Sequence, residues 1–339
     1  MEKAITPLYV AKGDTIELIA TSFGCTTEPY LTRLEASIKR LKKEGFKINE
    51  GKNIRRNDGV ASSAPPKERA EEFMDAYLNK DSSLIISVGG GEVMSDMLPY
   101  VDFEAIKKAK PKWFMGFSDN TSLTYLLTTN CNIKTVYGPN APSFYEKEFR
   151  FAQKDALRVL RGERHFEGYP KYYGKSNRDW PALYRPRANM VKTIVPYNYD
   201  SERKGTLLGG CLDVILTLVG TRFDKTLEFL KNRGPVIWYL EACDLSPLEI
   251  RRGLFQLKEA GYFDSANMFL LGRHLCGVWE HNEIMGVNKY NAATDILSPL
   301  GVPLLMDIDL GHLGPSMPII NGAEAIVKLD KGNIIIDYV

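Results

Sequence analysis

Short apolar runs typical of strands alternate with helix-like segments through the first half of the chain, and this alternation restricts the fold more than any other feature. Three strand-like runs occur there: residues 16–22, 83–88 and 113–117. In residues 30–46, apolar side chains recur every three or four positions, which predicts a helix, and Gly45 favours its end. Residues 66–78 repeat this pattern and predict a second helix. Strands that alternate with helices predict an α/β fold with a doubly wound, mostly parallel sheet, whose ligands lie beyond the carboxyl ends of the strands.

Residues 141–205 interrupt this pattern. They are rich in Tyr, Pro, Asn and charged residues and show little periodicity, which is typical of a connector with surface loops. Beyond them, apolar runs and a helical segment resume, and a length of 339 residues allows two domains. We therefore expect an N-terminal α/β domain over residues 1–150, a connector with loops over 151–204 and a second α/β domain over 205–339.

Composition argues against several classes of partner. The formal net charge is only +2 and the pI is near 8.1, so no strong field favours nucleic acid or an anionic membrane. The first residues lack the features of a secretory signal, and no stretch approaches ~18 uninterrupted apolar residues. The five cysteines are widely spaced without a CxxC pair, which fits reduced thiols. We expect a cytoplasmic protein that acts on a small molecule, without nucleic acid or membrane.

Three side chains suited to catalysis each follow an apolar run. Ser118 in GFSDN lies between a strand-like and a helical run, as in a nucleophile elbow, although Asn120 replaces the second glycine of G-x-S-x-G. Glu241 ends the run VIWYLE, and His312 lies in a Gly/Pro loop after another apolar run. Because strand ends gather the site of a parallel sheet, the pattern indicates a Ser/Glu/His triad. A helix N-cap for Ser118 and a structural ion pair for Glu241 remain alternatives.

The glycine run that follows residues 83–88 exposes backbone N–H groups. Gly89, Gly90 and Gly91 suit a phosphate or an oxyanion, although they match neither a Walker loop nor a full G-x-G-x-x-G. A tight turn without a ligand is the structural alternative.

A second constellation lies in RHLCGVWEHNE. It contains five potential metal ligands: His274, Cys276, Glu280, His281 and Glu283. Their spacing matches no familiar zinc pattern such as H-E-x-x-H. A surface loop with chance polar residues is the favoured interpretation, so we expect no metal site.

Several of these segments together resemble the LD-carboxypeptidases and their relatives, the microcin C self-immunity peptidases. GFSDNTSLTYLL resembles their G-[YF]-S-D-x-T-x-L segment, and TLLGGCLDVILTLVGT resembles L-x-G-G-N-L-x-x-L-x-x-x-x-G-T. LEACDLSPLEIRRGLFQL and GHLGPSMPIINGA are similar to the stretches that carry their glutamate and histidine, and GDTIELIATS to their first strand. The resemblance implies a two-domain serine peptidase with Ser118 as nucleophile, His312 as general base and Glu241 orienting His312.

The resemblance also implies an oxyanion hole, formed by the N–H of Asp119 with that of Gly90 or Gly91. Members of the family are commonly homodimers and need neither a metal nor an organic cofactor, and we expect the same here. Cys211 stands where the family commonly has Asn, and a thiol nucleophile or a packing role are its two interpretations. The segment SVGGGEVMSDMLPYVD lacks the Arg and Tyr of R-G-G-Y-G and looks closer to the microcin-immunity branch.

The substrate therefore stays open between a murein peptide and an aminoacyl adenylate. Trp180, in the loop segment SNRDWPALYRPR, either packs this loop onto its own domain or lies over the site and stacks on a flat group. In the microcin-immunity branch, a loop tryptophan at a similar place is associated with stacking on adenine. A non-catalytic protein that binds a nucleotide or carboxylate at the glycine run is the alternative function.

Overall fold

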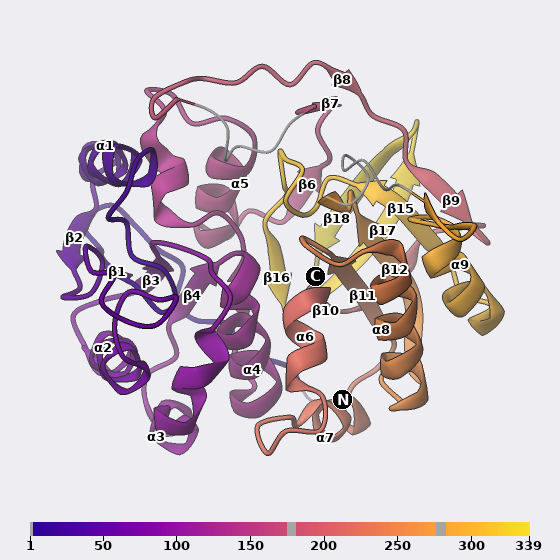
Figure 1. Cartoon of the computed structure of the whole chain (residues 1–339), viewed down its shortest axis with the longest axis horizontal. Coiled ribbons are helices and arrows are strands. Elements are labelled where there is room, and N and C mark those ends of the chain that lie inside the picture. The colour runs from indigo at the N-terminus through magenta and orange to yellow at the C-terminus, as the bar shows by residue number, and fades with distance from the viewer. Residues whose placement is uncertain (1–2, 175–180, 276–282) are drawn as a thin grey trace.

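The computed structural model describes residues 3–174, 181–275 and 283–339 and shows two sheets side by side, each flanked by helices (Figure 1). Among these residues, six strands form the first sheet, in the order β16-β5-β4-β3-β1-β2. Its parallel strands are β1 Thr15–Ile19, β2 Lys47–Glu50, β3 Leu84–Ser87, β4 Trp113–Gly116 and β5 Thr135–Tyr137. β16 Ile319–Asn321 is antiparallel to β5, so a late segment of the chain completes this sheet.

Strands β3, β4 and β5 of the first sheet are buried at every residue, because helices cover both faces of the sheet. On one face, Ile16 and Leu18 pack in the same core cluster as Leu34 and Ile38 of α1 Tyr30–Lys43. On the other face, the core cluster contains Phe73 of α2 Pro66–Leu78 together with Ile19, Ile85 and Phe114. Parallel sheets are typically buried in this way. α3 Phe103–Lys108 and α4 Thr121–Cys131 complete the helices of this half.

The second sheet has eight described strands, in the order β6-β18-β17-β10-β11-β12-β15-β9. Its parallel centre consists of β10 Arg203–Cys211, β11 Val236–Glu241, β12 Ala266–Gly272 and β15 Leu304–Ile308. The antiparallel strands are β6 His165–Glu167, β9 Val195–Tyr197, β17 Glu324–Asp330 and β18 Asn333–Tyr338. The helices of this half are α6 Leu212–Leu218, α7 Thr226–Lys231, α8 Pro247–Glu259 and α9 Asn291–Leu297. The two sheets confirm the α/β class predicted from the alternation.

Residues 151–204, which composition assigned to a connector with loops, contain regular structure. α5 Phe151–Leu160 is amphipathic, and β6 and β9 join the edges of the second sheet. β7 Lys171–Tyr172 pairs with β8 Met190–Val191 in a small antiparallel ladder. A further short pair consists of β13 Glu283–Ile284 and β14 Val287–Asn288. None of the helices in the described ranges is both long and apolar enough to cross a membrane.

The two sheets meet where α4 begins against the end of β10. The backbone N–H of Cys211 donates to Thr121 Oγ1 at 3.0 Å. Gly210 has φ +146°, and a Cβ there would lie 2.6 Å from Thr121 Cγ2. Glycine is therefore required for this close approach. The contact places the carboxyl ends of strands from both sheets next to each other.

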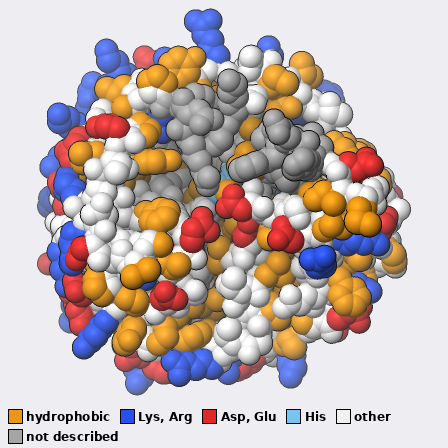
Figure 2. Space-filling model, viewed as in Figure 1, with side chains coloured by type: hydrophobic (Ala, Val, Ile, Leu, Met, Phe, Trp, Pro, Cys, Tyr) orange, Lys and Arg blue, Asp and Glu red, His pale blue; other side chains and the backbone are white. Residues whose placement is uncertain are grey.

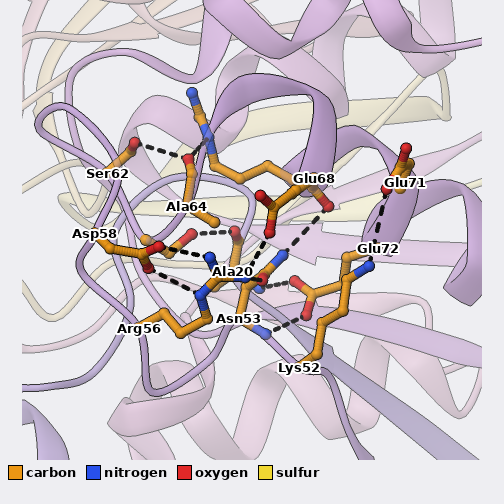
Figure 3. A network of polar contacts seen from close by, with 12 residues as sticks. Ala20, Lys52, Asn53, Arg56, Asp58, Ser62, Ala64, Glu68, Glu71 and Glu72 are labelled. Atoms are coloured by element: carbon orange, nitrogen blue, oxygen red, sulfur yellow. Dashed lines mark hydrogen bonds and ion pairs between the residues drawn. The ribbon is translucent and has the colours of Figure 1, made fainter.

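A buried carboxylate anchors the segment that follows β1. Glu72 of α2 accepts hydrogen bonds from the N–H of Ala20 at 2.9 Å and of Asn53 at 2.7 Å, while Arg56 pairs with Asp58 and Glu68 (Figure 3). Burial raises the pKa of the Glu72 carboxyl. The network fixes the chain immediately before residues 21–24, which border the candidate active site.

The face shown in Figure 2 carries basic side chains mainly around its rim, and acidic side chains both near its centre and along its rim. It presents no broad basic surface of the kind that binds nucleic acid.

Candidate active site

The turn between β4 and α4 directs Ser118 toward a histidine from the other half of the chain. Ser118 has φ +65°, a left-handed conformation that is strained for a residue other than glycine. Its Oγ lies 3.0 Å from His312 Nε2. α4 begins at Thr121 without a side-chain cap, so the Ser118 hydroxyl faces the imidazole and does not cap the helix.

Asn120 explains how the turn is held without the second glycine of a nucleophile elbow. Its buried side chain donates from Nδ2 to the carbonyls of Gly89 at 2.8 Å and Phe117 at 3.0 Å. Its Oδ1 accepts a hydrogen bond of 3.0 Å from Thr21 Oγ1. These contacts bind the turn to the glycine run and to the segment after β1.

Glu241 ends β11 and is fully buried, with a partner for each carboxylate oxygen. Oε2 lies 2.8 Å from His312 Nδ1, and Oε1 accepts a hydrogen bond of 2.5 Å from the Tyr137 hydroxyl. The Tyr137 oxygen also accepts from the backbone N–H of Ser118 at 3.3 Å. A buried charge requires such partners. Ser118, His312 and Glu241 thus form one continuous chain of polar contacts.

The electrostatics of these contacts favour a carboxylate beside an imidazolium. Burial opposes ionisation of Glu241, but His312 and the Tyr137 hydroxyl outweigh it and lower the pKa of the carboxyl. Burial also acts to lower the pKa of His312, whereas Glu241 and the Cys243 thiol raise it, and the pKa lies above the ordinary histidine value. Glu241 therefore stabilises the positive charge that His312 would acquire on taking a proton.

Gly311 allows the loop that carries His312 to approach Glu241. It has φ +104°, and a Cβ at this position would lie 2.8 Å from Glu241 Oε2. The Phe117 ring covers His312, with 4.4 Å between the ring centroids. Backbone conformation and an aromatic neighbour thus both restrict the imidazole.

Gly90 and Gly91 lie against the nucleophile turn. A Cβ at Gly90 would be 3.2 Å from Ser118 Oγ, and one at Gly91 would be 2.1 Å from Ser22 Oγ. Throughout the described part of the chain, the backbone N–H groups of Gly90, Gly91 and Asp119 meet no protein acceptor. Unpaired N–H groups beside a nucleophile suit an oxyanion.

Other predicted residues have structural roles or lie outside the described ranges. The carboxylate of Asp119 accepts from Ser22 Oγ at 2.6 Å and from the N–H of Met94 at 2.9 Å, so its side chain braces the turn. The Cys211 thiol is buried and donates to Asp213 Oδ2 at 3.4 Å. Burial, followed by the negative charge of Glu241, raises its pKa well above the usual range, which does not suit a thiolate nucleophile.

The alternative metal constellation is only partly described. His274 is buried, and its Nδ1 accepts a hydrogen bond of 3.0 Å from the N–H of Ala242, next to Glu241. Cys276, Glu280 and His281 lie outside the described residues, as does Trp180. Within the described ranges, no three His, Cys, Asp or Glu side chains are grouped so as to hold a metal ion.

Sequence reasoning missed two residues at the site. Tyr137 ends β5, so the strand-end argument that selected Ser118 could have selected it too. Phe23 follows β1, donates its N–H to the carbonyl of Gly90 at 3.0 Å and leaves 42% of its surface exposed. An exposed aromatic ring on an anchored backbone beside the glycine run is a candidate substrate contact.

Comparison with known proteins connects this geometry to a family. Residues 16–138 match the LD-carboxypeptidase N-terminal domain, and residues 204–327 match the LD-carboxypeptidase C-terminal domain. The chain is 27% identical to the microcin C7 self-immunity protein MccF of Escherichia coli, over 96% of this chain and 93% of that protein. It is 23% identical to the probable murein peptide carboxypeptidase of Bacillus subtilis, over 98% and 94%.

Solved structures agree with these matches. A variant of MccF in complex with adenosine monophosphate superposes with a TM-score of 0.84 at 25% identity, over 98% of both chains. The two domain models lie in the same order as the two sheets, and each of the curated relatives above covers nearly the whole chain. The chain therefore belongs to the LD-carboxypeptidase family and is a serine-type carboxypeptidase hydrolase.

Proposed function

We propose that Ser118, His312 and Glu241 are the catalytic triad of this hydrolase and that it cleaves an amide bond in a small aminoacyl nucleotide. The observation that carries the triad is the continuous path from Ser118 Oγ to His312 Nε2 at 3.0 Å and from His312 Nδ1 to Glu241 Oε2 at 2.8 Å. This arrangement has the roles of nucleophile, base and orienting acid that define such triads on unrelated folds.

In the proposed reaction, Ser118 Oγ attacks the carbonyl carbon and transfers its proton to His312 Nε2. The N–H groups of Asp119 and of Gly90 or Gly91 donate to the oxyanion of the tetrahedral intermediate. His312 then gives the proton to the departing amine, leaving an acyl-enzyme on Ser118. A water molecule hydrolyses this ester, again with His312 as base. The chain itself supplies every group that these steps use, so the proposed enzyme works without a cofactor.

The nucleotide part of the proposal rests on similarity and on aromatic side chains. The identity to the microcin C7 self-immunity protein is higher than that to the murein peptide carboxypeptidase, and a variant of the former has been solved with adenosine monophosphate. Phe23 offers an exposed ring beside Gly90. Trp180 is proposed as a second ring that stacks on the base, a contact worth about 1–3 kcal/mol.

Two substrates assayed side by side test this choice: an aminoacyl sulfamoyl adenosine with an acidic aminoacyl group, whose carbonyl is bonded to nitrogen as the proposed step requires, and a muropeptide that ends in D-Ala. We expect a higher kcat/KM for the adenylate. Trp180→Ala should raise the KM for the adenylate analogue by roughly ten- to a hundredfold, because the stacking contact between the ring and the base is lost. It should leave hydrolysis of the muropeptide nearly unchanged. Phe23→Ala should change KM in the same direction. A preference for the muropeptide would assign the enzyme to murein peptides. Equal losses on both substrates would return Trp180 to a packing role and remove the main reason for preferring the adenylate.

We further propose that the enzyme acts in the cytoplasm as a homodimer. The described cysteines Cys25, Cys131, Cys211 and Cys243 are all buried and form no disulfide, which fits a reducing compartment. The dimer follows from the family resemblance, and sedimentation equilibrium of the purified protein measures it directly: a mass of one chain would contradict it.

A further inference from the structure

The loop that carries His312 is held from behind by a buried arginine. Arg273 follows β12 and is 4% exposed. It donates to three backbone carbonyls: Nε to Leu313 at 3.3 Å, Nη1 to Asp307 at 3.2 Å and Nη2 to Pro315 at 3.4 Å. Two of these carbonyls follow His312 within three residues, and the third precedes it. Arg273 therefore fixes the backbone on both sides of the histidine.

A fully buried carboxylate joins this arginine to a lysine from a distant segment. Asp309 Oδ1 lies 2.8 Å from Arg273 Nη1, and its Oδ2 lies 2.8 Å from Lys192 Nζ. Oδ2 also accepts the N–H of Tyr169 at 2.6 Å, and the Asp309 carbonyl accepts the N–H of Met317 at 2.7 Å. Lys192 is itself 5% exposed along its side chain. Buried charges of this kind are stable only when paired, so their positions depend on one another.

The same three residues attach the β7–β8 ladder to the histidine loop. Lys192 directly follows β8, and Tyr172 of β7 places its ring 4.7 Å from the Arg273 guanidinium carbon. The next residue, Tyr173, donates its N–H to the carbonyl of Gly314 at 2.8 Å. The residues that directly follow β7 and β8, Tyr173 and Lys192, therefore bind the backbone of Gly314 and the carboxylate of Asp309, which both lie within three positions of His312.

We propose that Lys192, Arg273 and Asp309 are positioning residues, which hold His312 between Ser118 and Glu241 and couple it to the β7–β8 ladder. The proposal rests on the proposed triad, because it assigns these residues an effect through His312. Among the described residues, none of the three has a hydrogen bond or ion pair with Ser118 or Glu241. Proton transfer requires the Nε2 contact of 3.0 Å, and a displacement of about 1 Å can reduce a rate by about 10²-fold.

Lys192→Met tests the coupling most cleanly, because it retains the length of the side chain and leaves the Arg273–Asp309 pair in place. We expect kcat to fall by roughly 10- to 100-fold, with KM changed less than about threefold, on whichever of the two substrates above is hydrolysed faster. Tyr172→Leu is a second variant at a partly exposed position and should fold even if Lys192→Met does not. It should lower kcat in the same way, by less.

Lys112→Met is the matched control. Lys112 is also buried, and its ammonium donates to the carbonyls of Ala76 and Asn79 and to the hydroxyl of Ser82. It lies just before the first residue of β4, whereas Ser118 follows the last residue of that strand. Its loss should lower the melting temperature while kcat of the folded enzyme stays unchanged. A similar loss of kcat in both lysine variants would reduce Lys192 to a stabilising residue and overturn the proposal.

A double variant separates this proposal from the triad. If Lys192 acts through His312, adding Lys192→Met to His312→Ala should cause no further loss of kcat. Losses that multiply would overturn the positioning role while leaving the triad intact. Retention of wild-type kcat by His312→Ala alone would instead overturn the proposed function.

Discussion

Replacing Ser118 or His312 with alanine should lower kcat by roughly 10⁴- to 10⁶-fold. Ser118 is proposed to supply the attacking oxygen, and His312 Nε2, 3.0 Å away, to accept its proton, so neither group can act without the other. The double variant should therefore be about as slow as each single variant. Single-turnover hydrolysis with enzyme in excess measures losses of this size.

A second serine and a second histidine provide the controls. Ser122 is buried in α4, four positions after Ser118, and its hydroxyl has no partner within the described residues. His165 lies on β6 and pairs with Glu167 and Asp337. Ser122→Ala and His165→Ala should leave kcat within about twofold of the wild type. A folded Ser118→Ala enzyme with wild-type kcat would remove the central claim.

Glu241→Gln should lower kcat by roughly 10²- to 10⁴-fold, less than loss of the nucleophile. The amide can still accept a hydrogen bond from His312 Nδ1, which lies 2.8 Å from Oε2, but it no longer carries the charge that stabilises the imidazolium. The measurement is kcat on the same substrate, with circular dichroism to show that the variant is folded.

The same substitution has a predicted effect on pH dependence. A general base acts in its neutral form, so kcat/KM should rise with pH as His312 loses its proton. In the wild type, Glu241 keeps the pKa of His312 above its ordinary value of about 6.5, and the rising limb therefore lies above pH 6.5. Without the carboxylate charge, burial lowers that pKa, so the limb should move to lower pH. A limb in the same place in both proteins would show that another group is titrating.

Strand-end reasoning, which depends on local patterns, selected three residues that the structure brings together. Ser118, Glu241 and His312 each follow an apolar run, and each lies beside the others in the structure. Which polar group pairs with which could not be predicted in this way. Tyr137 and Glu241 are 104 residues apart, and nothing in the spacing of either indicates that β5 and β11 end side by side.

The segment 151–204 shows the opposite case. α5 has an apolar stripe that includes Leu157 and Leu160, but the surrounding Tyr, Pro and charged residues obscured it. β6 and β9 are three residues each, too short for a clear period-2 pattern, and they exist because edges of the second sheet are available to pair with them. The burial of Lys192 could not be predicted from its local sequence, since its buried partner Asp309 is 117 residues away.

The order of the chain bears on when this enzyme becomes active during synthesis. The proposed nucleophile at residue 118 is made long before its proposed base at 312, and β16, at residues 319–321, is needed to cover the open side of β5. A nascent chain that has reached the end of β5 carries an unreactive serine and an unpaired strand edge, which is a site for wrong pairing. With the proposed triad, hydrolysis requires that His312 and β16 have both left the ribosome, so shorter nascent chains cannot attack amide bonds.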